Sequence, residues 1–404
     1  MSAVVNATDF FAHAAVQDPY PLYDAMRRRA GVNRIGESGF YAVCGWDALV
    51  EAVNRVEDFS SNLTATMVYH DDGTVTPFDI GTLGGPMQVL ATADDPLHAQ
   101  HRKLLLPHLS AKRVRVIEEF AETTVKRLWS EATGDGRIEW MSAMANRLPM
   151  MVVAHLLGLP GDDVDKLIRW GYATTTLLDG IITEDQLAAA GVAAMELSAY
   201  VLEHFEKATE DPRPGLIGDL AARTGSGELE QLPALAIMVT LFSAAGESTA
   251  SLLGSAAWIL AERPDVQEQL RTRPELLGAF IEETLRCESP FRGHYRHVVN
   301  DTTLAGVELP ADSRLLLVWG AANRDPEHFE APDEFRLDRS AGRGHVAFGK
   351  GAHFCVGTPL ARLEAQIVLR TLLEQTTWVD AAEVGPWLPS ILVRRLERLE
   401  LNLR

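Results

Sequence analysis

One segment of the chain carries most of the information, and it reads Phe348-Gly349-Lys350-Gly351-Ala352-His353-Phe354-Cys355-Val356-Gly357-Thr358-Pro359-Leu360-Ala361-Arg362. The glycines let the backbone turn tightly and approach a flat object closely. Thr358 is suited to cap the next helix, with Pro359 at its first helical position. Cys355 then lies just before a helix N-terminus, where free N–H groups and partial positive charge stabilise a thiolate.

A thiolate held on such a loop suits a single bond to a metal ion. Tetrahedral zinc requires further Cys or His ligands at short spacing, and only His345 and His353 are near. The alternative is a buried structural cysteine at a helix start, which is what most isolated cysteines are. The ten-residue pattern from 348 to 357 as a whole favours the metal ligand.

The rest of the chain has mostly helical periodicity, with a few short strands. Helices are expected at 110–129, 148–157, 184–208, 235–260 and 359–375, and strands at 296–299, 303–304, 315–318, 391–394 and 399–403. The segment 235–260 is apolar on nearly all sides, so we expect it in the centre of the protein. A Pro/Gly/Asp-rich run over 323–351 shows no periodicity, which is typical of a functional segment. The pattern predicts a mainly α protein with a minor β-sheet region.

Composition limits the class of protein. The chain has 404 residues, 47% of them hydrophobic and 23% charged, as in an ordinary globular enzyme. No linker or repeat divides it, so we expect one domain over 1–404, with a poorly ordered N-terminus over 1–18. The net charge of -19 argues against a nucleic-acid partner.

Three distant cysteines form no disulfide framework, which fits a reducing compartment. Residues 1–20 contain no apolar run long enough to span a bilayer. We therefore expect a cytoplasmic protein without a membrane anchor.

The cysteine segment resembles the ligand loop of the cytochrome P450 family, F-G-x-G-x-H-x-C-x-G, at every defined position. The resemblance, to soluble bacterial members of actinobacterial type, covers the chain from Pro19 onward. It implies the cytochrome P450 fold, with haem b (iron protoporphyrin IX) between the long central helix and the helix after the cysteine. It also implies that Cys355 is the axial thiolate and metal ligand, that Phe348 shields the sulfur, and that His353 reaches a haem propionate. Thiolate ligation favours O–O cleavage at the iron.

Further haem contacts are implied by residues 94–102, which resemble the family's D-x-P-x-H-x-x-x-R stretch. His98 and Arg102 are four residues apart, so a helix presents both on one face. Arginine makes strong bidentate bonds to carboxylates such as the two haem propionates. Arg296 resembles the third propionate ligand, and His345 is a weaker candidate.

Glu283 and Arg286 resemble the family's E-x-x-R pair. Spacing alone means little, because most such pairs are surface ion pairs worth less than ~1 kcal/mol. Glu283 is selected by its position in the last helix before the strands. The resemblance implies a third partner from the aperiodic run, for which we favour Arg339 over Arg336. We expect this triad to hold the core together and to take no catalytic step.

The central helix carries a segment over 244–249 that resembles the family's oxygen-activation motif, small-Gly-x-acid-Thr-Thr, with departures. In one register Glu247 is the acid and Ser248 the alcohol. In the other, Ser248 stands at the acid position and Thr249 is the alcohol. We prefer the first because it places Glu247 at the family's usual distance before Glu283.

The chemistry at this segment needs an alcohol that holds the bound oxidant and its water, and an acid that relays protons from solvent. The alternative is that Ser248 and Thr249 only bond back to the helix while Glu247 is solvated. A carboxylate in so apolar a segment disfavours that alternative.

The resemblance also implies substrate contacts from four separate stretches. These contacts are Met87, Val89 and Leu90; Leu241, Phe242 and Ala245; Phe291, Arg292 and His294; and Ile391 and Leu392. They are mostly apolar, as expected for a ligand cavity. Arg292 and His294 could meet a carboxylate or hydroxyl, or could equally be exposed turn residues.

The implied activity is that of a monooxygenase, which inserts one oxygen atom of O2 into an apolar small molecule, lipid-like or aromatic. Electrons would come from NAD(P)H through a reductase and a ferredoxin, because the chain has no flavin or nicotinamide motif. The altered Ser248 and Thr249 region leaves open a peroxygenase or a dehydratase-like relative, and a non-enzymatic haem or ligand-binding protein is a further alternative. Another departure is Arg394-Arg395-Leu396, where many relatives have Arg-Gly-Leu.

The charge pattern predicts where the electron donor docks. The stretch 98–115 contains no Asp or Glu but carries Arg102, Lys103, Lys112, Arg113 and Arg115, and Lys350 and Arg362 flank the cysteine. A local basic surface on an acidic protein would steer an acidic iron–sulfur partner. Solvated helix charges in i,i+3 and i,i+4 pairs are the equal alternative.

Overall fold

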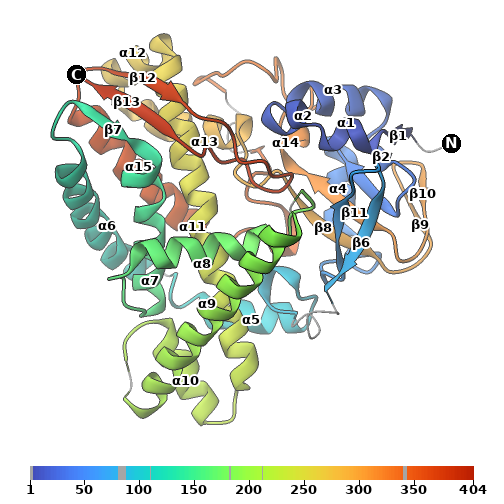
Figure 1. Ribbon diagram of the computed structural model, residues 1–404, viewed down its shortest axis with the longest axis horizontal. Coiled ribbons are helices and arrows are strands. Elements are labelled where there is room, and N and C mark those ends of the chain that lie inside the picture. The colour runs from blue at the N-terminus through green and yellow to red at the C-terminus, as the bar shows by residue number, and fades with distance from the viewer. Residues whose placement is uncertain (1–2, 81–87, 110, 182, 212, 340–343) are drawn as a thin grey trace.

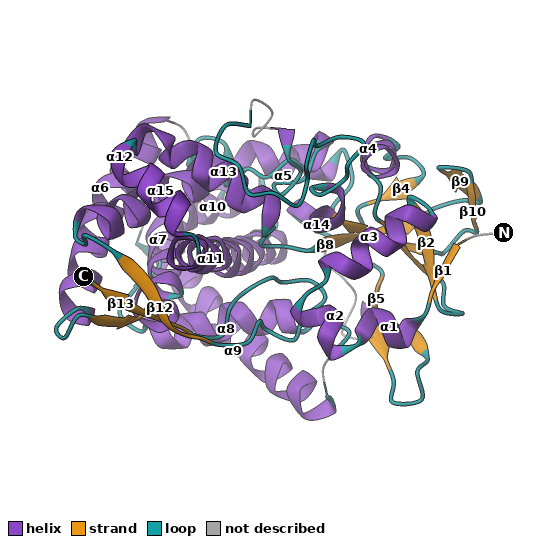
Figure 2. Ribbon diagram, turned by 90° about the horizontal axis from the view of Figure 1, so that it is seen from above, coloured by secondary structure: helices purple, strands orange, loops and turns teal. Residues whose placement is uncertain are grey.

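The computed structural model describes residues 3–80, 88–109, 111–181, 183–211, 213–339 and 344–404. Most of this part of the chain is helical, and most of its strands gather near the N-terminus (Figure 1). Figure 2 shows the helices filling one half of the molecule, with α11 (Gln231–Glu262) seen nearly end-on among them. The predicted mainly α fold with a minor β-sheet region is therefore confirmed.

The helices predicted from periodicity correspond to α6, α7, α9, α11 and α15, and the ends differ by a few residues. The described helices are α1 Ala7–Phe11, α2 His13–Gln17, α3 Tyr20–Arg29, α4 Trp46–Asn54, α5 Leu97–Leu105, α6 Ala111–Ala132, α7 Arg147–Leu157, α8 Val164–Thr176, α9 Glu184–Glu210, α10 Leu216–Gly225, α11, α12 Pro264–Thr272, α13 Leu277–Cys287, α14 Trp319–Ala322 and α15 Thr358–Glu374.

The largest sheet has the strand order β1-β2-β3-β11-β8-β4. The described strands are β1 Ala3–Val5, β2 Val32–Ile35, β3 Phe40–Val43, β4 Phe59–Ser60, β5 Ala65–Tyr69, β6 Val75–Asp79, β7 Arg137–Glu139, β8 Gly293–Val298, β9 Thr302–Leu304, β10 Val307–Leu309, β11 Arg314–Val318, β12 Val379–Val384 and β13 Leu399–Leu403. In β8, His294 lies opposite Leu317 and Arg296 opposite Leu315 of β11. Residues two apart in a strand face the same side, so His294 and Arg296 point together.

Two of our strand predictions need correction. The segment 391–394 forms no strand, because only Val393 pairs, in an isolated bridge to Phe291. The segment 296–299 is the second half of β8, which begins at Gly293.

Residues 3–18 form defined structure, contrary to our expectation for the N-terminus. β1 pairs in parallel with β2, and α1 and α2 bury Phe10, Phe11 and Val16. The Gln17 amide donates to the Trp387 carbonyl at 2.7 Å. Three apolar side chains in two five-residue helices are too few to produce a helical period, which is why hydrophobic patterning did not reveal them.

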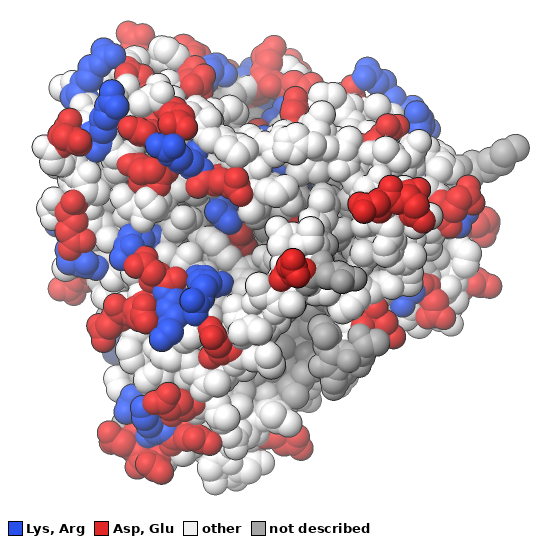
Figure 3. Space-filling model, viewed as in Figure 1, with Lys and Arg blue, Asp and Glu red and all other residues white. Residues whose placement is uncertain are grey.

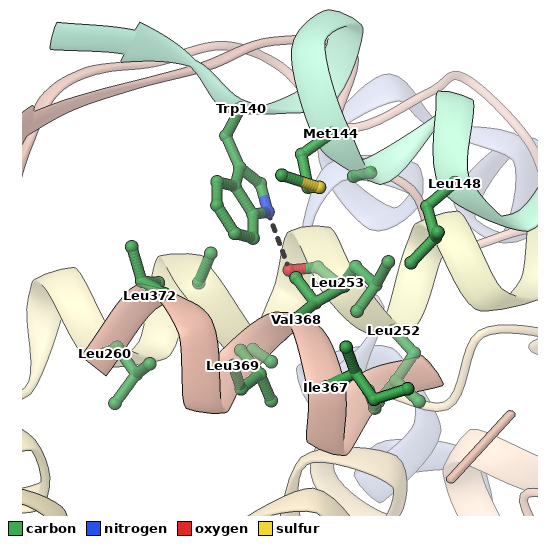
Figure 4. Packing of buried hydrophobic residues seen from close by; sticks show 14 of the residues in the cluster. Trp140, Met144, Leu148, Leu252, Leu253, Leu260, Ile367, Val368, Leu369 and Leu372 are labelled. Carbon is green, nitrogen blue, oxygen red and sulfur yellow. Dashed lines mark hydrogen bonds between the residues drawn. The ribbon is translucent and has the colours of Figure 1, made fainter. Parts of the chain in front are cut away.

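Helix α11 forms the centre of the core. In the cluster of Figure 4 it packs against α15, and Trp140 Nε1 donates to the Leu253 carbonyl at 3.0 Å. By length and composition alone α11 could cross a membrane, yet 50% of its most apolar window is buried inside the protein. It contacts α7, α8 and α15, which is the environment of a core helix in a globular protein.

Candidate active site

A cavity between α11 and the cysteine loop brings together most of the predicted site residues. Helix α11 contributes Thr240, Leu241, Ala244, Ala245, Ser248, Thr249 and Leu252, and the loop and α15 contribute residues from Ala347 to Glu364, with Phe348, His353 and Cys355 among them. The cavity lies where the resemblance places the haem, between the central helix and the helix after the cysteine.

Cys355 opens into this cavity from the loop before α15, and it is exposed there. Its backbone N–H donates to the Phe348 carbonyl at 3.0 Å. Helix α15 begins at Thr358, one residue earlier than predicted, and Thr358 Oγ1 donates to the Cys355 carbonyl at 2.8 Å instead of capping the helix. Among the described residues, no group of three or more His, Cys, Asp or Glu side chains could hold a metal ion. The cavity therefore suits ligation through one protein atom.

Although Cys355 faces the open cavity, the protein around it keeps bulk solvent from its thiol and raises the pKa, and the N–H groups of Gly357 and Thr358, the Thr358 hydroxyl and the charge of Arg102 oppose the rise without cancelling it. The helix N-terminus alone therefore does not produce the thiolate that we predicted. A cation bonded to the sulfur would, because a coordinating thiol loses its proton.

Four basic side chains from three parts of the chain meet in the cavity lining. His98 and Arg102 come from α5, Arg296 from β8, and His353 from the cysteine loop. The rings of His98 and His353 have centroids 4.0 Å apart. Arg102 Nη1 donates to the Phe354 carbonyl at 2.9 Å, which ties α5 to the cysteine loop.

This basic cluster has one acidic partner, Asp95, whose Oδ1 lies 3.2 Å from His98 Nδ1. Arg296 is buried and donates to the Tyr295 carbonyl at 2.7 Å, and no described carboxylate forms an ion pair with Arg296 or Arg102. Burial lowers the pKa of Arg296 to about 10. Burial, together with the charges of Arg296, His98 and Arg102, lowers the pKa of His353 to about 3. Two carboxylates bound here would relieve both effects, so the residues fit a haem with its two propionates.

His345 does not line the cavity, and its prediction as a propionate ligand is wrong. It is buried with Nε2 3.3 Å from Glu282 Oε2. Arg362 holds the same carboxylate at 2.6 and 2.7 Å, and its guanidinium lies 4.9 Å from the centroid of the Phe348 ring. Burial raises the pKa of Glu282, but the bonds from His345 and Arg362 outweigh it and hold the pKa at about 2. Arg362 is therefore engaged within the protein and not free for docking.

The structure brings Glu283, Arg286 and Arg339 together outside the cavity. Glu283 accepts Arg286 Nε at 2.9 Å and Nη2 at 2.8 Å, and Arg339 Nε at 2.8 Å. Arg336 contributes only its backbone N–H to Glu283, at 3.0 Å, while its side chain pairs with Asp338. Arg339 is thus the third member of the triad by geometry.

The acid–alcohol segment divides between two faces of α11. Ser248 and Thr249 line the cavity, whereas Glu247 does not. Ser248 Oγ donates to the Ala244 carbonyl at 2.8 Å, as the helix-bonding alternative expects, and the Thr249 hydroxyl has no partner among the described residues. Both registers therefore stay open.

Glu247 is buried, so the alternative in which its carboxylate is solvated is contradicted. Its Oε1 accepts Arg395 Nε at 3.1 Å. Burial raises its pKa, and Arg395 opposes the rise.

Only part of the predicted substrate contacts line the cavity. Leu90, Leu241, Ala245, Phe291 and His294 do so, and Met87 lies outside the described residues. Val89 and Phe242 are buried in the core beneath α7 and α9, and Ile391 and Leu392 are buried in the core around the N-terminal sheet. Arg292 is also buried, with Nη2 donating to the Val16 carbonyl at 2.6 Å. These corrections share a cause, since neighbouring residues in a helix or extended segment point in different directions.

Three features of the site escaped the sequence analysis. His294 Nδ1 accepts Trp319 Nε1 at 2.7 Å, which leaves the proton of the neutral ring on Nε2; burial lowers the pKa of His294 to about 4. Ser61 Oγ lies 2.9 Å from His353 Nε2. Glu364 lines the cavity, its Oε2 has no partner, and burial raises its pKa to about 8. The first two features are contacts between distant segments, and the third is a single acid on an amphipathic helix. No local sequence pattern marks either kind of feature.

Comparisons with known proteins agree with this geometry. The family model for cytochrome P450 matches residues 192–395. Cytochrome P450 144 of Mycobacterium tuberculosis is 66% identical over 404 residues, which cover 100% of this chain and 93% of that protein. Cytochrome P450 107B1 of Saccharopolyspora erythraea is 36% identical, covering 97% of this chain and 96% of that protein. The crystal structure of CYP109E1 from Bacillus megaterium in complex with testosterone superposes with a TM-score of 0.86 at 27% identity, covering 97% of this chain and 99% of the other.

Proposed function

The chain belongs to the cytochrome P450 family of haem-thiolate monooxygenases, and on that basis we propose that Cys355 ligates the iron and that the cavity binds an apolar small molecule for oxygenation. One observation carries this proposal: a lone thiol and an unbalanced cluster of buried basic groups line the same cavity. The bound haem supplies the activation of O2 from which one oxygen atom enters the substrate.

The basic residues hold the two propionates in this proposal. Arg296 and Arg102 supply guanidinium donors suited to carboxylates. His98 and His353 complete the cluster, and Ser61 orients His353 through the contact at 2.9 Å. Phe348 screens the Cys355 sulfur from the Arg362 side, because the Arg362 guanidinium lies against its ring.

Glu247 relays protons, and a hydroxyl beside it delivers them to the cavity. The carboxylate lies on the buried face of α11, while Ser248 and Thr249 face the cavity. Glu247 and the two alcohols lie on different faces of one turn of α11, so a proton taken up at Glu247 would reach a cavity hydroxyl by way of water. The free Thr249 hydroxyl supports the second register and the buried Glu247 carboxylate supports the first, so both alcohols remain candidates.

The cavity selects an apolar substrate with at least one hydrogen-bond acceptor. Its lining is dominated by Leu, Ala and Phe side chains, which bind apolar surface. His294 adds a neutral N–H donor whose orientation Trp319 fixes. The relative bound to testosterone supports this class, because testosterone is apolar and carries oxygen acceptors.

An acidic ferredoxin, reduced by its NAD(P)H reductase, delivers electrons to the cysteine side of the haem. Lys103, Lys112, Arg113 and Arg115 are exposed and form no ion pair with a described residue, and α5 is bonded to the cysteine loop through Arg102. On the face seen in Figure 3 acidic and basic side chains are interspersed, so this face offers no comparable basic surface. We place the protein in the cytoplasm, where such donors are found.

The ligand assignment is tested by the spectrum of the reduced protein with carbon monoxide. The wild type should give the red-shifted Soret band of thiolate ligation, and Cys355→Ser should lose it. Cys287→Ser is the matched control, because Cys287 is buried and does not line the cavity. Survival of the band in Cys355→Ser would show that another residue ligates the iron.

A further inference from the structure

Glu247 has a buried ionic partner that comes from far along the chain. Arg395 Nε lies 3.1 Å from Glu247 Oε1, and the two side chains are 11% and 2% exposed. A pair buried this deeply loses the solvation of both charges, and it persists only where the geometry is specific.

The pair is incomplete on the carboxylate side. Glu247 Oε2 is buried and has no hydrogen-bond partner. The Arg395 guanidinium lies 4.5 Å from the centroid of the Tyr172 ring, and the Tyr172 hydroxyl donates to Asn146 Oδ1 at 2.9 Å. The aromatic ring and the carboxylate thus fix the guanidinium from two sides, and only one carboxylate oxygen is engaged.

We propose that Arg395 is the positioning residue for Glu247: it binds Oε1, keeps the carboxylate ionised between transfers, and leaves Oε2 as the atom that takes up and releases the proton. This inference rests on the proposed role of Glu247 in proton relay. In each cycle Oε2 would take a proton from an entering water and release it through water towards the hydroxyl of Ser248 or Thr249, which would donate its own proton into the cavity as it receives this one, and the carboxylate would return to the anion beside Arg395. Without Arg395, the pKa of the Glu247 carboxyl would rise further, because burial is the largest influence on it.

The groups that face Glu247 are few. They are Arg395 from the C-terminal stretch, Tyr172 and the Thr175 hydroxyl from α8, and Asp179 from the turn after α8. Burial raises the pKa of Tyr172, so its hydroxyl is uncharged at neutral pH. Burial also raises the pKa of Asp179, and any negative charge there disfavours ionisation of Glu247. Arg395 and the Thr175 hydroxyl both favour the Glu247 anion, and Arg395 is the larger contributor and the one that carries a positive charge.

The test titrates the ferric holoenzyme by infrared difference spectroscopy, assigning the Glu247 carboxyl band by its absence in Glu247→Gln. In Arg395→Gln the midpoint of this band should move to higher pH by about one unit or more, because an opposite charge at this distance lowers a carboxyl pKa by about that much. Arg395→Lys should restore most of the wild-type midpoint. Arg398→Gln is the matched control, because Arg398 is 50% exposed and pairs with Glu383 and Glu400 away from the cavity.

A second readout separates this inference from the proposed function. Oxygen uptake is followed against pH with a surrogate iron–sulfur donor and its reductase. If Glu247→Gln leaves uptake and its pH profile unchanged, the relay role of Glu247 is wrong. If Glu247→Gln slows uptake but Arg395→Gln shifts neither the band nor the pH profile, Arg395 is only structural and the inference is overturned, even where that variant loses thermal stability.

Discussion

The substitution Glu283→Gln keeps the shape of the side chain and removes the negative charge between two buried guanidinium groups. Arg286 is 0% exposed and Arg339 is 8% exposed. The Glu283 carboxylate accepts three of their N–H groups and the Arg336 backbone N–H, all within 2.8–3.0 Å. A glutamine can accept at one oxygen only, and its amide opposes the remaining donors.

The expected loss of stability depends on which hydrogen-bond acceptors the two arginines retain. Removing one partner of a buried ion pair costs ~3–5 kcal/mol when the other charge is left uncompensated. Arg286 retains the carbonyls of Asn323, Pro332 and Glu334 as acceptors at 2.7–3.0 Å. We therefore expect the lower end, about 3 kcal/mol. Arg336→Ala is the matched control and should move the unfolding midpoint far less, because its side chain pairs only with exposed Asp338.

Urea unfolding of the holoprotein, followed by far-ultraviolet circular dichroism, measures the difference as a shift in midpoint at constant slope. The pH dependence provides a second check. Burial raises the pKa of Glu283, but Arg286 and Arg339 outweigh it and hold the pKa below the ordinary value. This contribution to stability is present above the ordinary glutamate pKa and is lost as the pH falls through the lowered one. The two variants should therefore differ most at neutral pH, and equal midpoints there would refute the reasoning.

Three further predictions concern the cavity and its approaches. Arg296→Met should speed the transfer of haem to an apoprotein acceptor about tenfold or more, since it removes a buried donor worth ~1.5–3 kcal/mol to a charged group; an unchanged rate would place the propionates elsewhere. Lys103→Glu should slow reduction by an acidic ferredoxin severalfold and make the reduction rate depend less on salt, as measured by stopped flow. A reduction rate that changes neither with this substitution nor with salt would show that the donor docks elsewhere. His294→Leu should weaken spectral binding of ligands with a carbonyl or hydroxyl by about tenfold while sparing hydrocarbons; equal losses for both classes would exclude a recognition role.

The parts of the site that could be predicted are those that depend on local backbone needs. The cysteine segment can be recognised in the sequence by Gly349 and Gly351, because both have a φ of +71° that other residues avoid. The length and apolar character of α11 likewise predict its central position. His98 and Arg102 share one helical face, so their spacing predicted that they act together.

The parts that could not be predicted are contacts between distant segments. Glu247 and Arg395 are 148 residues apart, and Ser61 and His353 are 292 apart. Neither pair shares an element, so no period or motif joins them. The direction of each residue next to the cavity also depends on tertiary packing, which is why Phe242 faces the core although its neighbour Leu241 faces the cavity.

In the described parts of the aperiodic run, 323–339 and 344–351, side chains supply several of the hydrogen bonds that hold the backbone. Asn323 Oδ1 accepts the Val346 N–H at 2.7 Å, and Asn323 Nδ2 donates to Ser289 Oγ at 2.8 Å. Arg286 binds the Asn323 carbonyl at 2.8 Å and the Pro332 carbonyl at 2.7 Å. Buried backbone groups need partners, and in the described part of this run turn hydrogen bonds, such as Phe329 N–H to the Asp325 carbonyl, supply some of them and these side chains supply others.

The network around Glu283 therefore positions the cysteine loop without touching the cavity. Through Arg286 it fixes Asn323, and through Asn323 it fixes Val346, two residues before Phe348. Loosening this chain of contacts should widen the range of positions open to Cys355. We expect Glu283→Gln to lose part of the red-shifted carbon monoxide band, which reports thiolate ligation, at urea concentrations well below global unfolding. A blue-shifted band, which reports haem without the thiolate ligand, should replace it. If the red-shifted band persists up to the unfolding midpoint, the loop is held by its own turns and by α15, and the triad stabilises the fold without positioning the ligand.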